Sequence, residues 1–209
     1  MADTEGKAEG DVALFEQFDD SDVRAMVEAF PLAWVCGGEV AELKASLLPL
    51  VGVFDGGGRL VELIGHMMRS NPLFHSLSQD PCTTILFKGP DAYVSPEYAG
   101  RTDWAPTWNY GQLKICARVE FDEALTGKSL QVLIDAMESG RPQPWQIAEL
   151  GTRYQAMLGH IIGFRATVTS LSGKFKLGQD EAENTLHAIL GALPDAETAA
   201  WMRRFNKGR

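Results

Sequence analysis

One stretch, Cys82 to Tyr110, constrains the fold more than any other part of the chain. It opens with a β-branched and aromatic run, Thr83 to Phe87, which Gly89-Pro90 interrupts before a second run, Ala92 to Ser95. Short apolar runs bounded by glycine and proline are typical of β-strands. The stretch therefore predicts a bent or bulged strand pair, in keeping with a β-barrel.

A tryptophan-rich loop is predicted to follow these strands and to carry Trp104, Trp108, Asn109 and Tyr110. Large flat side chains on a loop indicate a binding surface or an interface. Trp108 and Asn109 join a flat apolar face to an amide that both donates and accepts hydrogen bonds, which suits a planar heteroaromatic ligand such as a flavin. A tryptophan buried in a subunit interface explains the same residues, and the sequence leaves both open.

The apolar periodicity of the remaining chain predicts antiparallel strands with helices inserted late. The other strands are predicted at 32–36, 47–54, 59–64, 113–121, 162–169 and 174–177, with Ser172-Gly173 as the turn before the last. The helices are predicted at about 21–30, from Pro72 onward, at 129–140, at 145–160 and at 186–193, with a final amphipathic turn or two beyond Pro194. Because the strands form hairpins without crossover helices between them, a small closed or split barrel is favoured over a parallel α/β sheet.

Composition narrows the class of protein. A chain of 209 residues with 45% hydrophobic and 22% charged residues predicts one large globular domain without a need for disulfides or metals. The net charge of −9 argues against binding to a nucleic-acid backbone. Three widely spaced cysteines indicate reduced thiols, and the acidic opening lacks an apolar targeting segment, so we expect a cytoplasmic protein without a membrane span.

Most motifs of enzyme chemistry are missing from the sequence. The four histidines stand at no metal-ligand spacing, and no GxSxG, HExxH, GxxxxGK[ST] or GxGxxG pattern occurs. Glycines 56–58 follow one predicted strand and precede another, so they indicate a hairpin turn. The sequence therefore names no catalytic residue.

The sequence after residue 64 outlines an anion site. Pro72 stands where a short helix should begin, with Asn71 or Ser70 as its N-cap. A helix N-terminus presents backbone N–H groups and a positive dipole end, and Arg69 and His66 lie nearby in the sequence. A phosphate site and a plain helix cap with a surface arginine both explain Arg69, and His66 can equally be a structural histidine.

Four sequence blocks, in the same order and spacing, resemble the PaiB-type FMN-binding "negative transcriptional regulator" proteins, which are relatives of the pyridoxamine-phosphate-oxidase split barrel. GHMMRSNP is similar to GHMARANP, FKGPDAYVSPEY to FxGPHAYVSPSWY, APTWNY to VPTWNY, and GKFKLGQD to GKWKLSQN. The resemblance covers about residues 20–180. It implies a flexible acidic tail at 1–19, a split-barrel FMN-binding domain at 20–180 and a helical extension at 181–209.

The resemblance implies a mainly β fold, a six-stranded antiparallel Greek-key split barrel with peripheral helices, and a homodimer with FMN at the subunit interface. The isoalloxazine would be lined by Lys44, Ala45, Ser46, Leu47 and Leu48 and by Ile64, Gly65, His66 and Met67. Arg69, Ser70 and Asn71 would hold the phosphate. Trp108 and Asn109 would approach from the partner subunit, and Lys176 and Gln179 would close the site.

The chain departs from the family pattern at several places, of which Leu47 is the most important, because the family has a histidine there. Three hypotheses follow for function. The first is a flavin-dependent redox protein acting on a small molecule, and the second is an FMN-binding regulator or sensor without turnover. The third is a barrel that has lost its cofactor, with Leu47, Trp104 and Trp108 filling the cleft.

Overall fold

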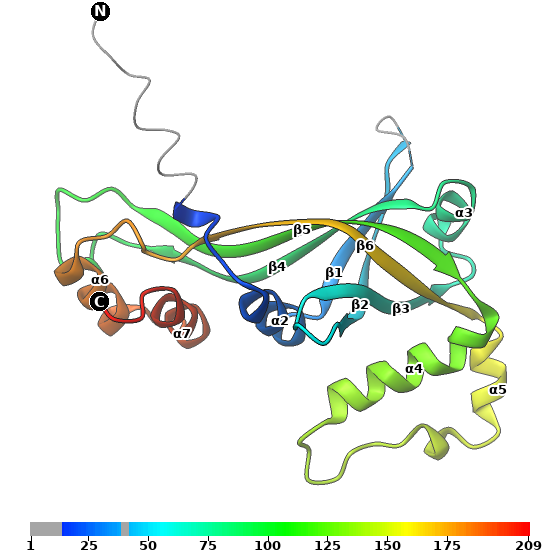
Figure 1. The fold of residues 1–209 in the computed structure, drawn as a ribbon. Helices are drawn as coiled ribbons and strands as arrows, with labels where there is room; N and C mark the ends of the chain where they lie inside the picture. Colours follow the sequence, from blue (N-terminus) through cyan, green and yellow to red (C-terminus); the bar gives the residue numbers. More distant parts are fainter. Residues whose placement is uncertain (1–13, 39–41) are drawn as a thin grey trace, which may run out of the picture. The chain divides into compact units, whose positions relative to one another are not determined.

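The computed structural model describes residues 14–38 and 42–209, and a closed barrel of six antiparallel strands is its central feature (Figure 1). The strands are β1 (Leu32–Gly37), β2 (Lys44–Phe54), β3 (Leu60–Met68), β4 (Cys82–Val94), β5 (Thr107–Phe121) and β6 (Ile161–Lys176). Their order around the barrel is β1-β2-β3-β6-β5-β4. Because β4 returns beside β1 rather than beside β3, the connection is a Greek key, which confirms the predicted fold.

The described chain divides into two compact units. The barrel unit comprises Asp20–Phe87 and Lys114–Leu171, and the helical unit comprises Lys88–Leu113, Ser172–Arg209 and the described residues 14–19. The barrel unit contains α2 (Asp20–Ala29), α3 (Pro72–Gln79), α4 (Glu123–Glu138), the 3-10 helix η2 (Ile147–Leu150) and α5 (Arg153–Leu158). The helical unit contains α6 (Glu183–Ala192) and α7 (Ala196–Phe205).

The interior of the barrel is filled by apolar side chains from alternate strand positions, as the period of two predicts. Val35, Leu50, Leu63, Ile85, Ile115 and Phe164 are all fully buried. Gly65 lies opposite Leu50 in the β2–β3 ladder, and a Cβ atom there would come within 2.6 Å of Leu50 Cδ2 and 2.8 Å of Phe164 Cζ. Glycine at this position is therefore required by close packing inside the barrel.

The predicted hairpin between β2 and β3 is confirmed, although both strands are longer than predicted. Asp55 N donates to Arg59 O at 3.0 Å, and Asp55 Oδ1 accepts from Gly57 N at 2.9 Å and from Arg59 N at 3.0 Å. Gly58 has a φ of 90°, a left-handed conformation that favours glycine. The three glycines thus form a turn, as the sequence indicated.

The predicted break at Gly89-Pro90 is wrong, because β4 runs without interruption from Cys82 to Val94. Proline lacks the N–H group that a strand ladder uses. However, β1 pairs with β4 only from Thr84 to Phe87, so Pro90 lies beyond this ladder and no β1–β4 bond is lost. Proline position alone could not reveal where the partner strand ends.

Two further strand predictions also need correction. Trp108, Asn109 and Tyr110 belong to β5 and do not lie in a loop. Ser172-Gly173 is no turn, because β6 continues through it to Lys176. A Cβ atom at Gly173 would come within 2.9 Å of Leu113 Cδ2 and of Phe18 Cε1, so close packing explains this glycine.

The helices between β5 and β6 differ most from the prediction. Helix α4 begins six residues earlier than predicted, because Asp122 caps it and accepts a hydrogen bond from Ala124 N at 2.8 Å. The predicted helix at 145–160 is divided into η2 and α5 by Gly151, whose φ is 54°. Neither of these two short helices contains a buried residue. Their apolar side chains therefore do not form a buried helix face.

The helical unit has its own apolar core around β6. Phe175 is fully buried and stacks on Phe205, with ring centroids 4.7 Å apart. Phe18 packs against Phe175 at 5.3 Å and Phe15 is buried, so residues 14–19 of the expected tail belong to this unit. The remainder of that tail, residues 1–13, lies outside the described residues. The expected C-terminal helices are present as α6 and α7.

Candidate functional site

A cluster of hydrogen-bonded side chains forms where β3 ends and α3 begins. Asn71 caps α3, because its Oδ1 accepts from Leu73 N at 3.0 Å, and Pro72 is the first helical residue, as predicted. Asn71 Nδ2 also donates to Ser46 Oγ of β2 at 2.9 Å. The turn into the helix is closed by Asn71 N, which donates to Met68 O at 2.9 Å. The structure thus brings Ser46, Arg69, Ser70 and Asn71 to one corner of the barrel unit.

The backbone of α3 offers fewer donors to an anion than its sequence predicted. Pro72 has no N–H group, Leu73 N donates to Asn71 Oδ1, and Phe74 N donates to Asn71 O at 2.9 Å. Asn71 therefore already occupies the donors that a helix start normally presents to a phosphate. Affinity for an anion at this corner must come mainly from side chains.

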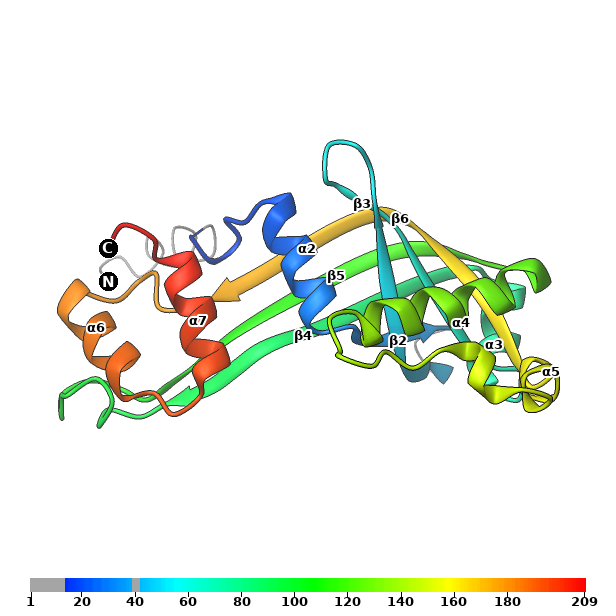
Figure 2. The ribbon, with the colours of Figure 1, turned by 90° about the horizontal axis from the view of Figure 1, so that it is seen from below.

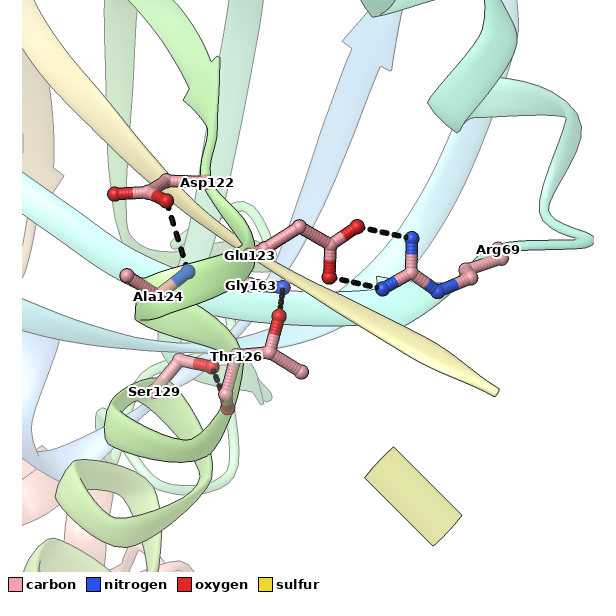
Figure 3. A network of polar contacts seen from close by, with 7 residues as sticks. All are labelled: Arg69, Asp122, Glu123, Ala124, Thr126, Ser129 and Gly163. Atoms are coloured by element: carbon pink, nitrogen blue, oxygen red, sulfur yellow. Dashed lines mark hydrogen bonds and ion pairs between the residues drawn. The ribbon is translucent and has the colours of Figure 1, made fainter. Parts of the chain in front are cut away.

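Arg69 is the cation of this corner, and its guanidinium forms a fork with Glu123, the first residue of α4 (Figure 3). Arg69 Nη1 donates to Glu123 Oε1 at 2.8 Å, and Arg69 Nη2 donates to Glu123 Oε2 at 2.6 Å. A guanidinium has five N–H donors, so Nε and one N–H on each terminal nitrogen are left for a second anion. The Arg69 side chain keeps 32% of its surface exposed, which leaves it accessible.

Glu123 was missed by reasoning from the sequence. The hydrogen bonds from Arg69 lower the pKa of its carboxyl group, and its side chain is 73% exposed. A carboxylate in the first turn of a helix is common, so the sequence marks Glu123 as a helix-start residue at most. Its pairing with Arg69 joins positions 54 residues apart and depends on the way α4 packs on the barrel.

Alternation along β3 separates the expected flavin-lining residues into two sets. Gly65 and Met67 are buried toward the barrel interior and cannot reach an external ligand. His66 faces the opposite way and is half-buried, with no hydrogen-bond partner for its buried Nδ1 atom in the described structure. Burial lowers the pKa of His66 below its ordinary value. An unsatisfied buried ring nitrogen is consistent with a ligand that has a polar edge.

The expected β2 residues lie beside an exposed apolar surface. Leu47, which stands where the family has histidine, is 43% exposed, whereas Leu48 is buried. Leu47 lies opposite Trp34 of β1, which in turn lies opposite Leu86 of β4. Trp34 is 48% exposed and Leu86 40% exposed, and Leu32, two residues before Trp34, is 50% exposed. We call Leu32, Trp34, Leu47 and Leu86 the apolar band. Lys44 and Ala45 are also exposed.

The helical unit holds the other expected site residues. Trp108 is 54% exposed and makes an edge contact with Tyr93, with ring centroids 6.0 Å apart. Its neighbour Asn109 is buried, and Asn109 Nδ2 contacts Met202 Sδ at 3.4 Å. Successive strand residues point to opposite faces, so only Trp108 of this pair is available to a ligand or a second chain.

Three polar side chains of the helical unit already have partners within it. Gln179 Nε2 donates to Phe175 O at 2.6 Å, and its Oε1 accepts from Leu177 N at 2.7 Å, so this side chain stabilises the end of β6. Lys176 Nζ donates to Thr107 Oγ1. Trp104 Nε1 donates to Glu181 Oε2 at 3.1 Å. Roles in closing a flavin site stay predictions for Lys176 and Gln179.

No group of three or more His, Cys, Asp or Glu side chains is placed to hold a metal ion within residues 14–38 and 42–209. In the same residues, no helix combines the length and the apolarity that crossing a bilayer requires.

The names of the curated relatives of this chain do not mention a flavin. It is 25% identical over 139 residues to "Protease synthase and sporulation protein PAI 2" of Bacillus subtilis, with 65% of this chain and 66% of the relative covered. It is 28% identical over 171 residues to an uncharacterized protein of Emericella nidulans, with 66% and 68% covered. The chain thus spans about two thirds of the length of these relatives.

Several solved structures share the fold of this chain. The fold is similar to that of the FAD and heme binding protein from Mycobacterium smegmatis, with a TM-score of 0.61, 18% identity, and 82% of this chain and 78% of the other covered. It is also similar to the flavocytochrome Anf3 from Azotobacter vinelandii, with a TM-score of 0.54, 16% identity, and 76% and 68% covered. These likenesses concern the fold alone. The model of the family described as "Putative FMN-binding domain" matches residues 13–170, so the chain belongs to that family and is a PaiB-like homologue.

Proposed function

We propose that the chain binds FMN as a homodimer and that the bound flavin performs redox chemistry on a small molecule. The observation that carries this proposal is the corner formed by Ser46, Arg69 and Asn71, together with His66, which shortly precedes Arg69 along the chain and has a buried ring nitrogen without a partner in the described structure. FMN combines a phosphate dianion with a planar ring that has polar edges. The corner offers a guanidinium and hydroxyl groups for the first, and β3 offers the half-buried ring of His66 for the second, whereas Ile64 is buried.

The residues at this corner are compatible with the phosphate of FMN. The three N–H groups of Arg69 that Glu123 leaves free include Nε and one terminal nitrogen on the same edge, which suits two phosphate oxygens. Ser70 is exposed in the turn between β3 and α3, so its hydroxyl is accessible to a ligand. When bound, the flavin supplies hydride or electron transfer, and the protein supplies binding and orientation.

A second copy of the chain is part of this proposal. The apolar band lies on three adjacent strands, and Leu47 directly follows Ser46 on β2, so the band begins beside the corner. Contiguous exposed apolar side chains of this size mark interaction surfaces. With a second copy on the band, the exposed ring of Trp108 from that copy would provide a flat apolar face for the flavin.

A regulatory role without turnover is the alternative function. The name of the Bacillus subtilis relative refers to protease synthesis and sporulation rather than to a reaction. Among the expected site residues, His66 is the one titratable group with an unsatisfied buried ring nitrogen, and burial holds its pKa low, so it favours the neutral form. An assay for NAD(P)H-dependent bleaching of the flavin separates the two functions, because a sensor without turnover leaves the flavin oxidised.

The experiment that tests the phosphate site is a titration of flavin-free protein with FMN and with riboflavin, which lacks the phosphate. We expect Arg69→Ala to weaken FMN binding by about tenfold or more, because a charge-assisted fork is lost, and to leave riboflavin binding unchanged. Flavin fluorescence quenching measures both affinities. If the FMN affinity of Arg69→Ala equals that of the wild type, Arg69 does not hold the phosphate.

Glu123→Gln is the matched variant on the other side of the fork. It removes a negative charge from beside the phosphate and weakens the competing hydrogen bonds to Arg69. We therefore expect FMN to bind several-fold more tightly, with riboflavin unaffected. Weaker FMN binding in this variant would show that Glu123 positions the guanidinium for the phosphate rather than competing with it.

A further inference from the structure

A cavity of about 410 Å³ lies in the barrel unit between α2, α4 and the middle of β2. None of the residues proposed to hold FMN lines it. Figure 2 shows α2 and α4 on the same side of the barrel unit, beside β2. The last turns of both helices contribute to its walls, through Val27 and Glu28 of α2 and Asp135 to Met137 of α4. Its volume lies within the range of about 300–1,000 Å³ that small-molecule sites occupy.

One part of the cavity wall is apolar. Val27, Pro31 and Val51 contribute hydrocarbon surface from α2, from the turn that follows it and from β2. Met137 of α4 adds a further apolar side chain to the wall and is 40% exposed. A ligand with an apolar body would cover this surface.

The polar part of the wall is negative. Glu28 and Asp135 contribute carboxylates from two different helices, and no lysine, arginine or histidine is among the described residues that line the cavity. Helix C-termini carry partial negative charge, and neither α2 nor α4 has a basic residue in its last turn to offset it. Two carboxylates and two helix C-termini therefore all make the electrostatic potential at this wall negative.

Nearby cations only partly neutralise this charge. Arg24 lies 3.5 Å from the Glu28 carboxylate, while its guanidinium carbon sits 3.8 Å from the centre of the Phe54 ring. Arg141 pairs with Glu138 and donates to Met137 O at 3.4 Å, outside the cavity wall. Asp135 accepts a hydrogen bond from the neutral amide of Gln131 at 2.7 Å. Among the described residues, no lysine, arginine or histidine forms an ion pair with Asp135.

We propose that this cavity binds a small organic ammonium ion, with the ammonium group between Glu28 and Asp135 and its apolar body against Val27, Val51 and Met137. Charge complementarity selects a cation, and the apolar wall selects one that carries hydrocarbon. A phosphate-bearing ligand such as FMN is disfavoured by the same charges. Helix α4 spans 16 residues, so about 24 Å separates its first residue, Glu123, from this end.

The test uses the full chain, flavin-free and flavin-loaded, with 2-phenylethylammonium and cyclohexylmethylammonium as probes and 2-phenylethanol as the neutral control. Calorimetry measures affinity, and the methyl resonance of Met137 in ¹³C-methyl-methionine NMR reports where the probe binds. We expect saturable binding of the ammonium probes with a shift of the Met137 resonance, and binding of the alcohol at least about tenfold weaker. Absence of saturable binding of both probes, or equal binding of the alcohol, overturns the proposal.

Variants make the assignment specific. Asp135→Asn and Glu28→Gln should each lower the affinity for 2-phenylethylammonium about tenfold, whereas Glu120→Gln on the exposed face of β5 removes an equal charge elsewhere and should change nothing. Ala136→Phe should fill the cavity and abolish binding with both carboxylates intact. If Ala136→Phe does not fold, the two carboxylate variants decide. Unchanged affinity in both contradicts the site, and neither result depends on flavin binding.

Discussion

Two faces of the same barrel differ in how far helices of the chain cover them. On one, α2 and α4 pack against β2 and β3 (Figure 2). The guanidinium of Arg24 also lies over the Phe54 ring there. On the other, the apolar band on β2, β1 and β4 is left 40–50% exposed. Both faces are made of strands with buried inner residues, so strand pattern alone does not distinguish them. What differs is whether a helix of the same chain covers the outer residues.

The face that no helix covers is the one that needs a partner. Leaving a sheet face that carries Trp34 and three leucines in water costs free energy, at roughly 25 cal/mol per Å² of apolar surface that could be buried. On the covered face, the chain's own helices bury that surface. On the bare face, the described residues provide nothing equivalent, and a second copy of the chain is the occupant that the proposed function requires.

The largest expected effect comes from placing a charge in the apolar band. Trp34→Asp should raise the dissociation constant of the dimer by at least about a hundredfold, because a carboxylate would be buried without a partner. Sedimentation velocity over a range of protein concentrations measures this change. Since Trp34 is already 48% exposed, the monomer should keep its circular dichroism spectrum.

Met157→Asp is the matched control for that variant, because Met157 of α5 is 42% exposed in the same unit but lies outside the band. We expect the dimer of this variant to be unchanged. If Met157→Asp dissociates the dimer and Trp34→Asp does not, the interface lies on the segment between α4 and β6. The apolar band would then need another explanation.

The next effect concerns the covered face, where α4 comes so close to β6 that only glycine fits. A Cβ atom at Gly163 would lie 2.7 Å from the backbone C and O atoms of Leu125 and from Thr126 N. Gly163 N also donates to Thr126 Oγ1 at 3.1 Å (Figure 3). Gly163→Ala should therefore lower the free energy of unfolding by about 1–3 kcal/mol in urea denaturation.

Gly191→Ala serves as its control. Gly191 lies in α6, and a Cβ atom there would have no heavy atom within 4 Å. Alanine is the better helix former, so this variant should be neutral or stabilising by up to about 1 kcal/mol. Equal destabilisation by both substitutions would show that contact between α4 and β6 is not what makes Gly163 necessary.

The sequence predicted those features that depend on neighbouring residues. The alternation from Leu113 to Phe121 correctly identified a strand with one buried face, and Asn71-Pro72 correctly placed the start of α3. It failed where a distant segment decides the outcome. Pro90 is tolerated because β1 pairs no further than Phe87, and the apolar residues at 145–160 were assigned to one helix that Gly151 divides.

The candidate site shows the same division. Order along the chain places Ser70 and Asn71 beside Arg69 in any fold, and their joint role in holding a phosphate stays a prediction. No local signal showed that Glu123 pairs with Arg69, because that contact depends on where α4 packs. The inward orientation of Asn109 against Met202 depends on α7, which lies far along the chain from β5. The family resemblance indicated which positions belong to the site. The directions in which their side chains point depend on packing between distant segments, which the resemblance did not reveal.

The smallest expected effect is a pH dependence of stability at His66 of β3. Burial lowers the pKa of this histidine below its ordinary value of 6.5, so between the two values the unfolded chain binds more protons than the folded one. The unfolding free energy should therefore fall as the pH decreases from about 6.5, and His66→Gln should flatten this dependence, whereas His75→Gln, at an exposed position on α3, should not. Urea denaturation of flavin-free protein at several pH values measures it. An identical pH profile for the wild type and His66→Gln would mean that His66 is not buried in its neutral form, and the match between its unsatisfied nitrogen and a flavin edge would lose its support.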